Sequence, residues 1–126
     1  MFAINEDKSI YITRGDIASI EVSALDPSGE PHTFQPGDLV RIQVFDKKNV
    51  HNVKLSKGVL VEEATTAVEI LLETEDTRYG ELVHKPTDYW YEITINPYTA
   101  PQTIVGYDVD GPKIFRLFPE GRNLDE

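Results

Sequence analysis

Apolar and polar residues alternate along much of the chain, with a period of two. The clearest run spans residues 17–25, where the even-numbered positions are apolar and positions 19, 21 and 23 are serine or glutamate. Successive side chains of a strand point to opposite faces, so this pattern predicts a half-buried strand in a sheet with one face toward solvent. Similar runs predict further strands at residues 9–13, 40–44, 58–62, 68–72, 91–95, 102–107 and 113–118.

Turn-forming residues separate these runs at short intervals, for example at Asp26–Gly29, Pro36–Asp38 and Asp110–Gly111. Seven to eight short strands with such spacing predict an all-β sandwich or small barrel. Asp110–Gly111 predicts a hairpin turn that makes the last two strands antiparallel neighbours. Only a single helical turn, around Glu75–Arg78, is expected, so the chain should contain almost no helix.

The inward positions of the predicted strands define the expected core. The length of 126 residues fits one domain, which we expect to span residues 1–119 and to be followed by a polar, frayed tail at 120–126. The predicted core contains Ile20, Val22, Val40, Ile42, Val44, Val68, Ile70, Leu72, Tyr91, Ile93 and Ile95.

Charge and cysteine content exclude several classes of function. The chain has 12 Lys+Arg, 22 Asp+Glu and a formal net charge of −10, which disfavours binding to nucleic acid and to anionic membranes. It contains no cysteine, which excludes disulfides, thiolate metal sites and cysteine nucleophiles. The first residues lack the basic and apolar regions of a signal peptide, and no apolar run is long enough to span a membrane.

Candidate chemistry is sparse. His32, His51 and His84 lack the short spacing of metal ligands, so we expect no catalytic residues, cofactor, metal or small-molecule ligand. Asp108–Gly111 matches half of a calcium loop but lacks the distant bidentate acid, and a hairpin turn is the favoured interpretation. Arg14–Asp16 spells an adhesion tripeptide, although a turn leading into the strand at Ile17 explains it better.

The aromatic run at residues 89–91 is a candidate interaction site. In a strand, Tyr89 and Tyr91 share one face and Trp90 lies on the other. The simpler interpretation places the tyrosines in the core and Trp90 over the opposite face. Trp90 is alternatively an interface anchor, or Trp90 or Tyr98 is a stacking platform for a carbohydrate.

A second candidate is a basic stretch in an otherwise acidic chain. It is either a solvated hairpin or a surface that meets an acidic surface on a neighbouring molecule, such as another copy of the chain. The residues of this stretch are Lys47, Lys48, His51, Lys54 and Lys57.

Several segments, taken together, resemble immunoglobulin-like proteins encoded in phage and prophage structural modules of Gram-positive bacteria. The N-terminal domain of upper baseplate proteins is the best-known relative. The resembling segments are Thr13–Ala18, Gly29–Pro31, Phe34, Gly37–Asp38, Val40–Val44, Asp76–Thr77, Gly80–Glu81, Tyr89–Ile93, Pro101–Asp108, Gly111–Phe115 and Phe118–Gly121.

This resemblance implies an immunoglobulin-like antiparallel β-sandwich with a non-enzymatic structural or adaptor role in a phage or prophage particle. It implies a tail or baseplate component that binds other virion proteins and copies of itself. The expected location is the virion, after synthesis in the bacterial cytoplasm. A carbohydrate-binding or adhesion module of the same fold is the alternative.

Overall fold

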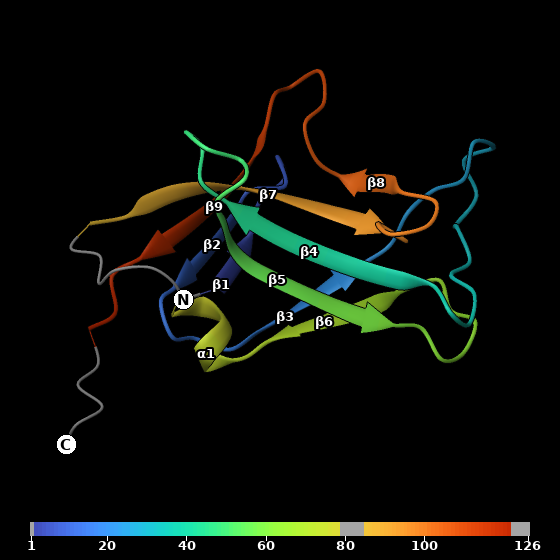
Figure 1. Cartoon of the computed structure of the whole chain (residues 1–126), viewed down its shortest axis with the longest axis horizontal. Helices are drawn as coiled ribbons and strands as arrows, with labels where there is room; N and C mark the ends of the chain where they lie inside the picture. Colours follow the sequence, from blue (N-terminus) through green and yellow to red (C-terminus); the bar gives the residue numbers. More distant parts are fainter. Residues whose placement is uncertain (1, 79–84, 122–126) are drawn as a thin grey trace.

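The computed structural model describes residues 2–78 and 85–121. Within these residues the structure is all-β apart from one helical turn, as the alternation predicted (Figure 1). Its elements are β1 (Phe2–Ile4), β2 (Ile10–Thr13), β3 (Ala18–Val22), β4 (Leu39–Phe45), β5 (Val53–Leu60), β6 (Val68–Leu72), α1 (Thr74–Thr77), β7 (Thr87–Ile95), β8 (Gln102–Val105) and β9 (Lys113–Phe118).

Two sheets enclose the core. The large sheet has the strand order β1-β2-β9-β7-β4-β5, with β8 also paired to β7, and the small sheet consists of β3 and β6. In Figure 1 the small sheet lies below the long strands β4 and β5. The inward side chains of both sheets form one hydrophobic cluster. The predicted all-β sandwich is therefore confirmed.

The pairing differs from the prediction in two places. β2 pairs with β9 in parallel, with Ile10 beside Phe115, so the large sheet is mixed rather than wholly antiparallel. β8 and β9 are not neighbours, because both pair with β7, along its Ile93–Ile95 and Thr87–Tyr91 portions respectively. Alternation specifies which face of a strand is buried but not the direction of its partner, so the sequence pattern could not distinguish these arrangements.

The predicted core is confirmed at all its positions, each at most 8% exposed. The sequence pattern missed two kinds of core residue. Some lie in the strands predicted at 9–13, 58–62 and 113–118, for which no buried face was assigned, whereas Phe34 and Leu55 lie outside every predicted strand. The missed core residues include Ile10, Ile12, Phe34, Leu55, Val61, Phe115 and Leu117.

The Arg14–Asp16 segment is a structural turn, as the favoured interpretation held. Gly15 has φ +86°, a conformation that glycine adopts without steric cost. Its N–H donates a 2.9 Å hydrogen bond to Oγ1 of Thr77, and the Thr77 hydroxyl donates to the Asp16 carbonyl at 3.0 Å. The buried hydroxyl of α1 thus connects the helix to the turn that precedes β3.

Replacing Thr77 with valine should lower the free energy of unfolding by about 2 kcal/mol, because the buried Gly15 N–H loses its acceptor. Thr77 is 0% exposed, so water does not replace the hydroxyl. Chemical denaturation measures the difference. Thr77→Ser keeps the hydroxyl and loses only the methyl group, so it serves as the control. A valine variant as stable as the wild type would show that the hydrogen bond contributes nothing.

The C-terminal boundary of the domain lies beyond the predicted one. Glu120, assigned from the sequence to the frayed tail, has a side chain only 6% exposed and forms ion pairs with Arg14 and Arg78. It therefore belongs to the sandwich. The rest of the predicted tail, apart from Gly121, lies outside the described residues.

Candidate protein-binding face

Trp90 lies on the outer face of the large sheet, opposite the core. Along β7 it pairs with Phe45 of β4 on one side and with Ile114 of β9 on the other. Tyr91 is 4% exposed and Tyr89 packs against the core from the same side. The strand alternation thus places both tyrosines inward and Trp90 outward, as the simpler interpretation predicted.

A depression of about 270 Å³ surrounds Trp90. The Tyr107 ring meets the Trp90 ring edge to face, with centroids 6.3 Å apart and planes inclined by 68°. Two loops border it: residues 46–52, between β4 and β5, and residues 106–112, between β8 and β9. We call it the Trp90 depression; its lining is Phe45, Val50, Trp90, Tyr91, Glu92, Tyr107, Pro112 and Lys113.

The 46–52 loop carries part of the predicted basic stretch. Lys47, Lys48 and His51 are all exposed, and we call these three residues the basic rim. Internal hydrogen bonds order this loop: the Lys48 N–H donates to Oδ1 of Asp46 at 2.8 Å, and the His51 N–H donates to Oδ1 of Asn49 at 3.1 Å. The three side chains are therefore presented by a structured turn.

Lys54 and Lys57 neither line the Trp90 depression nor belong to the 46–52 loop. Both lie in β5, three residues apart and therefore on opposite faces of the strand, and Lys57 shares the inward face with buried Leu55. Lys57 is 3.0 Å from the Asp76 carboxylate of α1, and this hydrogen bond raises the pKa of Lys57. The predicted basic stretch is divided because its second half is a strand whose side chains alternate between faces.

The 106–112 loop is acidic and carries the predicted turn. The backbones of Asp108 and Gly111 exchange hydrogen bonds, and Gly111 has φ +98°. Lys113 lies 2.8 Å from Asp108, and its hydrogen bond lowers the pKa of Asp108. We call Asp108 and Asp110 the acidic rim; between them Val109 is fully exposed. A turn closed by the Asp108–Gly111 backbone hydrogen bonds therefore accounts for this sequence, but it is not the predicted hairpin, because β8 and β9 pair with β7 and not with each other.

An ion pair lies beside Trp90 on the same face. Arg116 and Asp88 form a two-pronged contact, with Nε–Oδ1 2.6 Å and Nη2–Oδ2 3.1 Å, and the guanidinium carbon of Arg116 lies 4.9 Å from the centroid of the Tyr11 ring. The Arg116 hydrogen bond is the main cause that lowers the pKa of Asp88, with a smaller contribution from the charge of Lys47.

Asp88→Asn should remove a pH-dependent part of the stability. Because the pKa of Asp88 is lower in the folded state than its ordinary 3.8, the ion pair stabilises the fold above pH ~4 and is lost as pH falls through the folded-state value. We expect a loss of about 0.5–1 kcal/mol at pH 7 that shrinks toward pH 2. Denaturation at several pH values measures it, with exposed Glu63→Gln as control; a constant difference at every pH would contradict the ion-pair assignment.

Tyr98, the other candidate platform, lies at the opposite end of this sheet. It lies three residues beyond Ile95, the last residue of β7, whereas Trp90 lies near the middle of β7 and pairs with the last residue of β4. Its hydroxyl accepts a 3.0 Å hydrogen bond from Arg41, whose guanidinium carbon is 5.2 Å from the ring centroid. The structure does not bring the two aromatic residues together.

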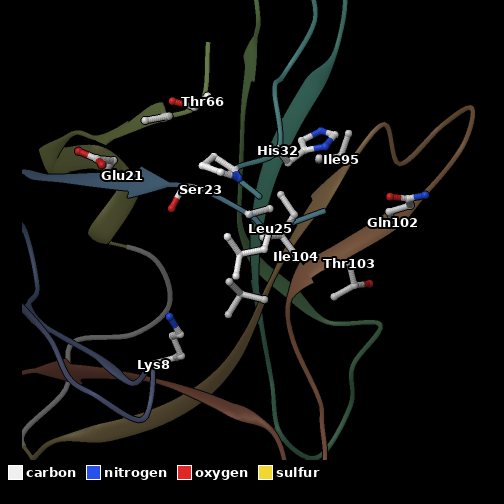
Figure 2. Close-up of a pocket in the computed structure, with 14 residues that line it drawn as sticks. Lys8, Glu21, Ser23, Leu25, His32, Thr66, Ile95, Gln102, Thr103 and Ile104 are labelled. Carbon is white, nitrogen blue, oxygen red and sulfur yellow. The ribbon is translucent and has the colours of Figure 1, made fainter. Parts of the chain in front are cut away.

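A larger groove of about 700 Å³ lies between β3 and β8. Figure 2 shows Lys8 and His32 at opposite ends of it, with Leu25 and Ile104 between them and Glu21 set apart. These ionisable side chains therefore do not form an acid–base pair. Within residues 2–78 and 85–121, no cluster of three or more His, Cys, Asp or Glu side chains suits a metal ion; the third histidine, His84, lies outside these ranges.

Two further searches of the chain, for a membrane-spanning helix and for similar proteins, give no information about the role of this face. In the described part of the chain, no helix is long and apolar enough to cross a membrane. Comparison with protein-family models, curated proteins and solved structures finds no match to the chain.

Proposed function

We propose that this protein is a non-enzymatic structural or adaptor module that acts through protein–protein contacts at the Trp90 depression. The observation that carries the proposal is a partly exposed tryptophan in an apolar depression between two ordered, charged loops. Tryptophan and tyrosine supply large contact areas at low entropic cost, and such residues dominate the binding energy of many interfaces. Charged residues around an apolar centre orient a protein partner.

We further propose that the contacts serve a phage or prophage particle, at its tail or baseplate. The resemblance of the Thr13–Ala18 and Tyr89–Ile93 segments to immunoglobulin-like phage proteins supports this role. The acidic net charge of −10 supports protein partners over packaged DNA, because phosphate binding depends on basic residues. In this role the protein is made in the bacterial cytoplasm and binds neighbouring virion proteins.

Purified particles from a host that carries the gene provide the test of this role. We expect mass spectrometry to detect the protein in particles at a fixed ratio to a tail protein, and Trp90→Ala to lower that ratio. Leu60→Ala, at an exposed apolar residue that does not line the depression, is the matched control. Particles without the protein, while it is abundant in the same lysate, would contradict the proposal.

Tryptophan fluorescence distinguishes carbohydrate binding at Trp90 from protein binding. Trp90 is the only tryptophan in the chain, so its emission reports directly on occupancy of the depression. We expect no change when cell-wall glycan fragments are added. A saturable shift that Trp90→Phe abolishes would instead assign the depression to a sugar.

A further inference from the structure

The Trp90 depression lies beside an exposed apolar residue that has no role in the fold. Val109, at the tip of the 106–112 loop, is fully exposed, and Tyr107 and Val50 on the two bordering loops are 73% and 48% exposed. Exposed apolar groups gathered around an apolar depression are typical of a binding surface. This face therefore presents both a protruding side chain and a recess that could receive one.

Opposite charges flank the depression on its two sides. In the strand order, β8 and β9 lie on one side of β7 and β4 and β5 lie on the other. The acidic rim is thus on one side of Trp90 and the basic rim on the other. Figure 1 shows the two loops that carry these rims on the same, upper side of the large sheet. The exposed Asp110 side chain projects from a turn whose backbone is held by Asp108.

This arrangement is complementary to itself. A two-fold axis parallel to β7 and passing through the face exchanges the two sides of the depression. The basic rim of one copy then meets the acidic rim of the other, and each contact occurs twice. An axis perpendicular to β7 within the same face would instead bring like charges together, so charge selects one of the two orientations.

We propose that the partner of this face is a second copy of the chain, paired about that two-fold axis. Val109 of each copy enters the Trp90 depression of the other, and Lys47 and Lys48 face Asp110. The inference rests on the proposed function, since it identifies the protein that binds the depression. Because the contact is symmetric, it closes at two copies and leaves the rest of the surface for other proteins.

The contribution of Val109 is tested by sedimentation equilibrium of the full chain. We expect the wild-type protein to dimerise with a dissociation constant below about 100 µM, and Val109→Ser to weaken dimerisation by about tenfold or more. Leu25→Ser changes another exposed apolar residue, 71% exposed and outside this face, and should have no effect. A wild-type monomer at ~1 mM, or equal effects of the two substitutions, would overturn the proposal.

The charge pairing is tested by two variants, each of which reverses the charge of one rim. Protein carrying Lys47→Glu and Lys48→Glu should dimerise about tenfold more weakly than wild type at low salt, and so should protein carrying Asp110→Lys, because each then opposes like charges. A mixture of the two should form heterodimers, since both of its rim contacts are again of opposite charge. Circular dichroism verifies that each variant is folded.

A mixture that associates no better than either variant alone overturns the pairing geometry. This failure is distinguishable from failure of the proposed function. A protein that stays monomeric but is found in particles retains the structural role with a different partner, whereas a dimer that is absent from particles contradicts that role.

Discussion

Replacing Phe115 with alanine should lower the free energy of unfolding by about 4 kcal/mol, the largest effect we expect from a single substitution. Phe115 is 0% exposed and lies in β9 between Ile10 of β2 and Tyr89 of β7. Its ring also meets that of Tyr91, with centroids 6.4 Å apart. Alanine leaves a cavity where the parallel and antiparallel parts of the large sheet meet, and rigid strands on both sides limit its collapse.

Chemical denaturation of the purified variant measures this loss. Phe115→Leu retains most of the apolar volume and should cost only about 1–1.5 kcal/mol. Tyr11, which pairs with the next residue of β9 and is half-buried on the outer face, provides a matched control: Tyr11→Ala should cost markedly less than Phe115→Ala. Equal losses at the two positions would show that the paired strands β2 and β9 do not divide their side chains between core and surface as described.

Phe115 is buried like the predicted core residues but was not itself predicted to be in the core, and this difference shows what alternation can reveal. The runs around Ile20, Ile42, Ile70 and Ile93 are long enough for the period of two to identify their buried faces, and every predicted core position is buried. Phe115 belongs to a predicted strand, but the sequence pattern did not show that β9 joins β2 in parallel. That pairing depends on contacts between residues about 105 positions apart.

The candidate site was predicted in part. The sequence placed Trp90 on the opposite face from its tyrosine neighbours, because that follows from strand geometry alone. It could not show that the loops at 46–52 and 106–112 border the same depression, which requires β4 and β9 to flank β7. Nor could it separate Lys57 from Lys47, since the Lys57–Asp76 ion pair depends on where α1 packs.

Glu120 illustrates the same limit at the C-terminal end of the domain. Its polar surroundings in sequence predicted a frayed tail, yet its carboxylate lies 3.4 Å from Nη1 of Arg14 and 2.5 Å from Nη2 of Arg78. Arg14 also donates to the Arg78 carbonyl at 3.1 Å. At Gly15 a side chain would place its first carbon 2.8 Å from Oε1 of Glu120, so the Glu120 ion pairs would have to shift, and the φ of +86° independently favours glycine there.

Glu120→Ala should therefore destabilise the protein by about 3 kcal/mol, because it leaves the Arg14 guanidinium, only 15% exposed, without its carboxylate. Chemical denaturation at pH 7 measures the loss. Glu120→Gln keeps the shape of the side chain but not its charge, and should fall between alanine and wild type. The exposed Glu30, which contributes no side-chain ion pair within the described residues, supplies the control substitution Glu30→Ala.

The alanine variant also decides between the two descriptions of the C-terminal end. If Glu120 were part of a frayed tail, its removal would cost no more than that of Glu30, within about 0.5 kcal/mol of wild type. If it closes the sandwich by joining β9 to the Arg14–Asp16 turn and to α1, the loss should also appear as faster amide hydrogen exchange at Gly15. That amide is protected through Thr77, so its exchange rate reports whether the turn and helix separate when the carboxylate is removed.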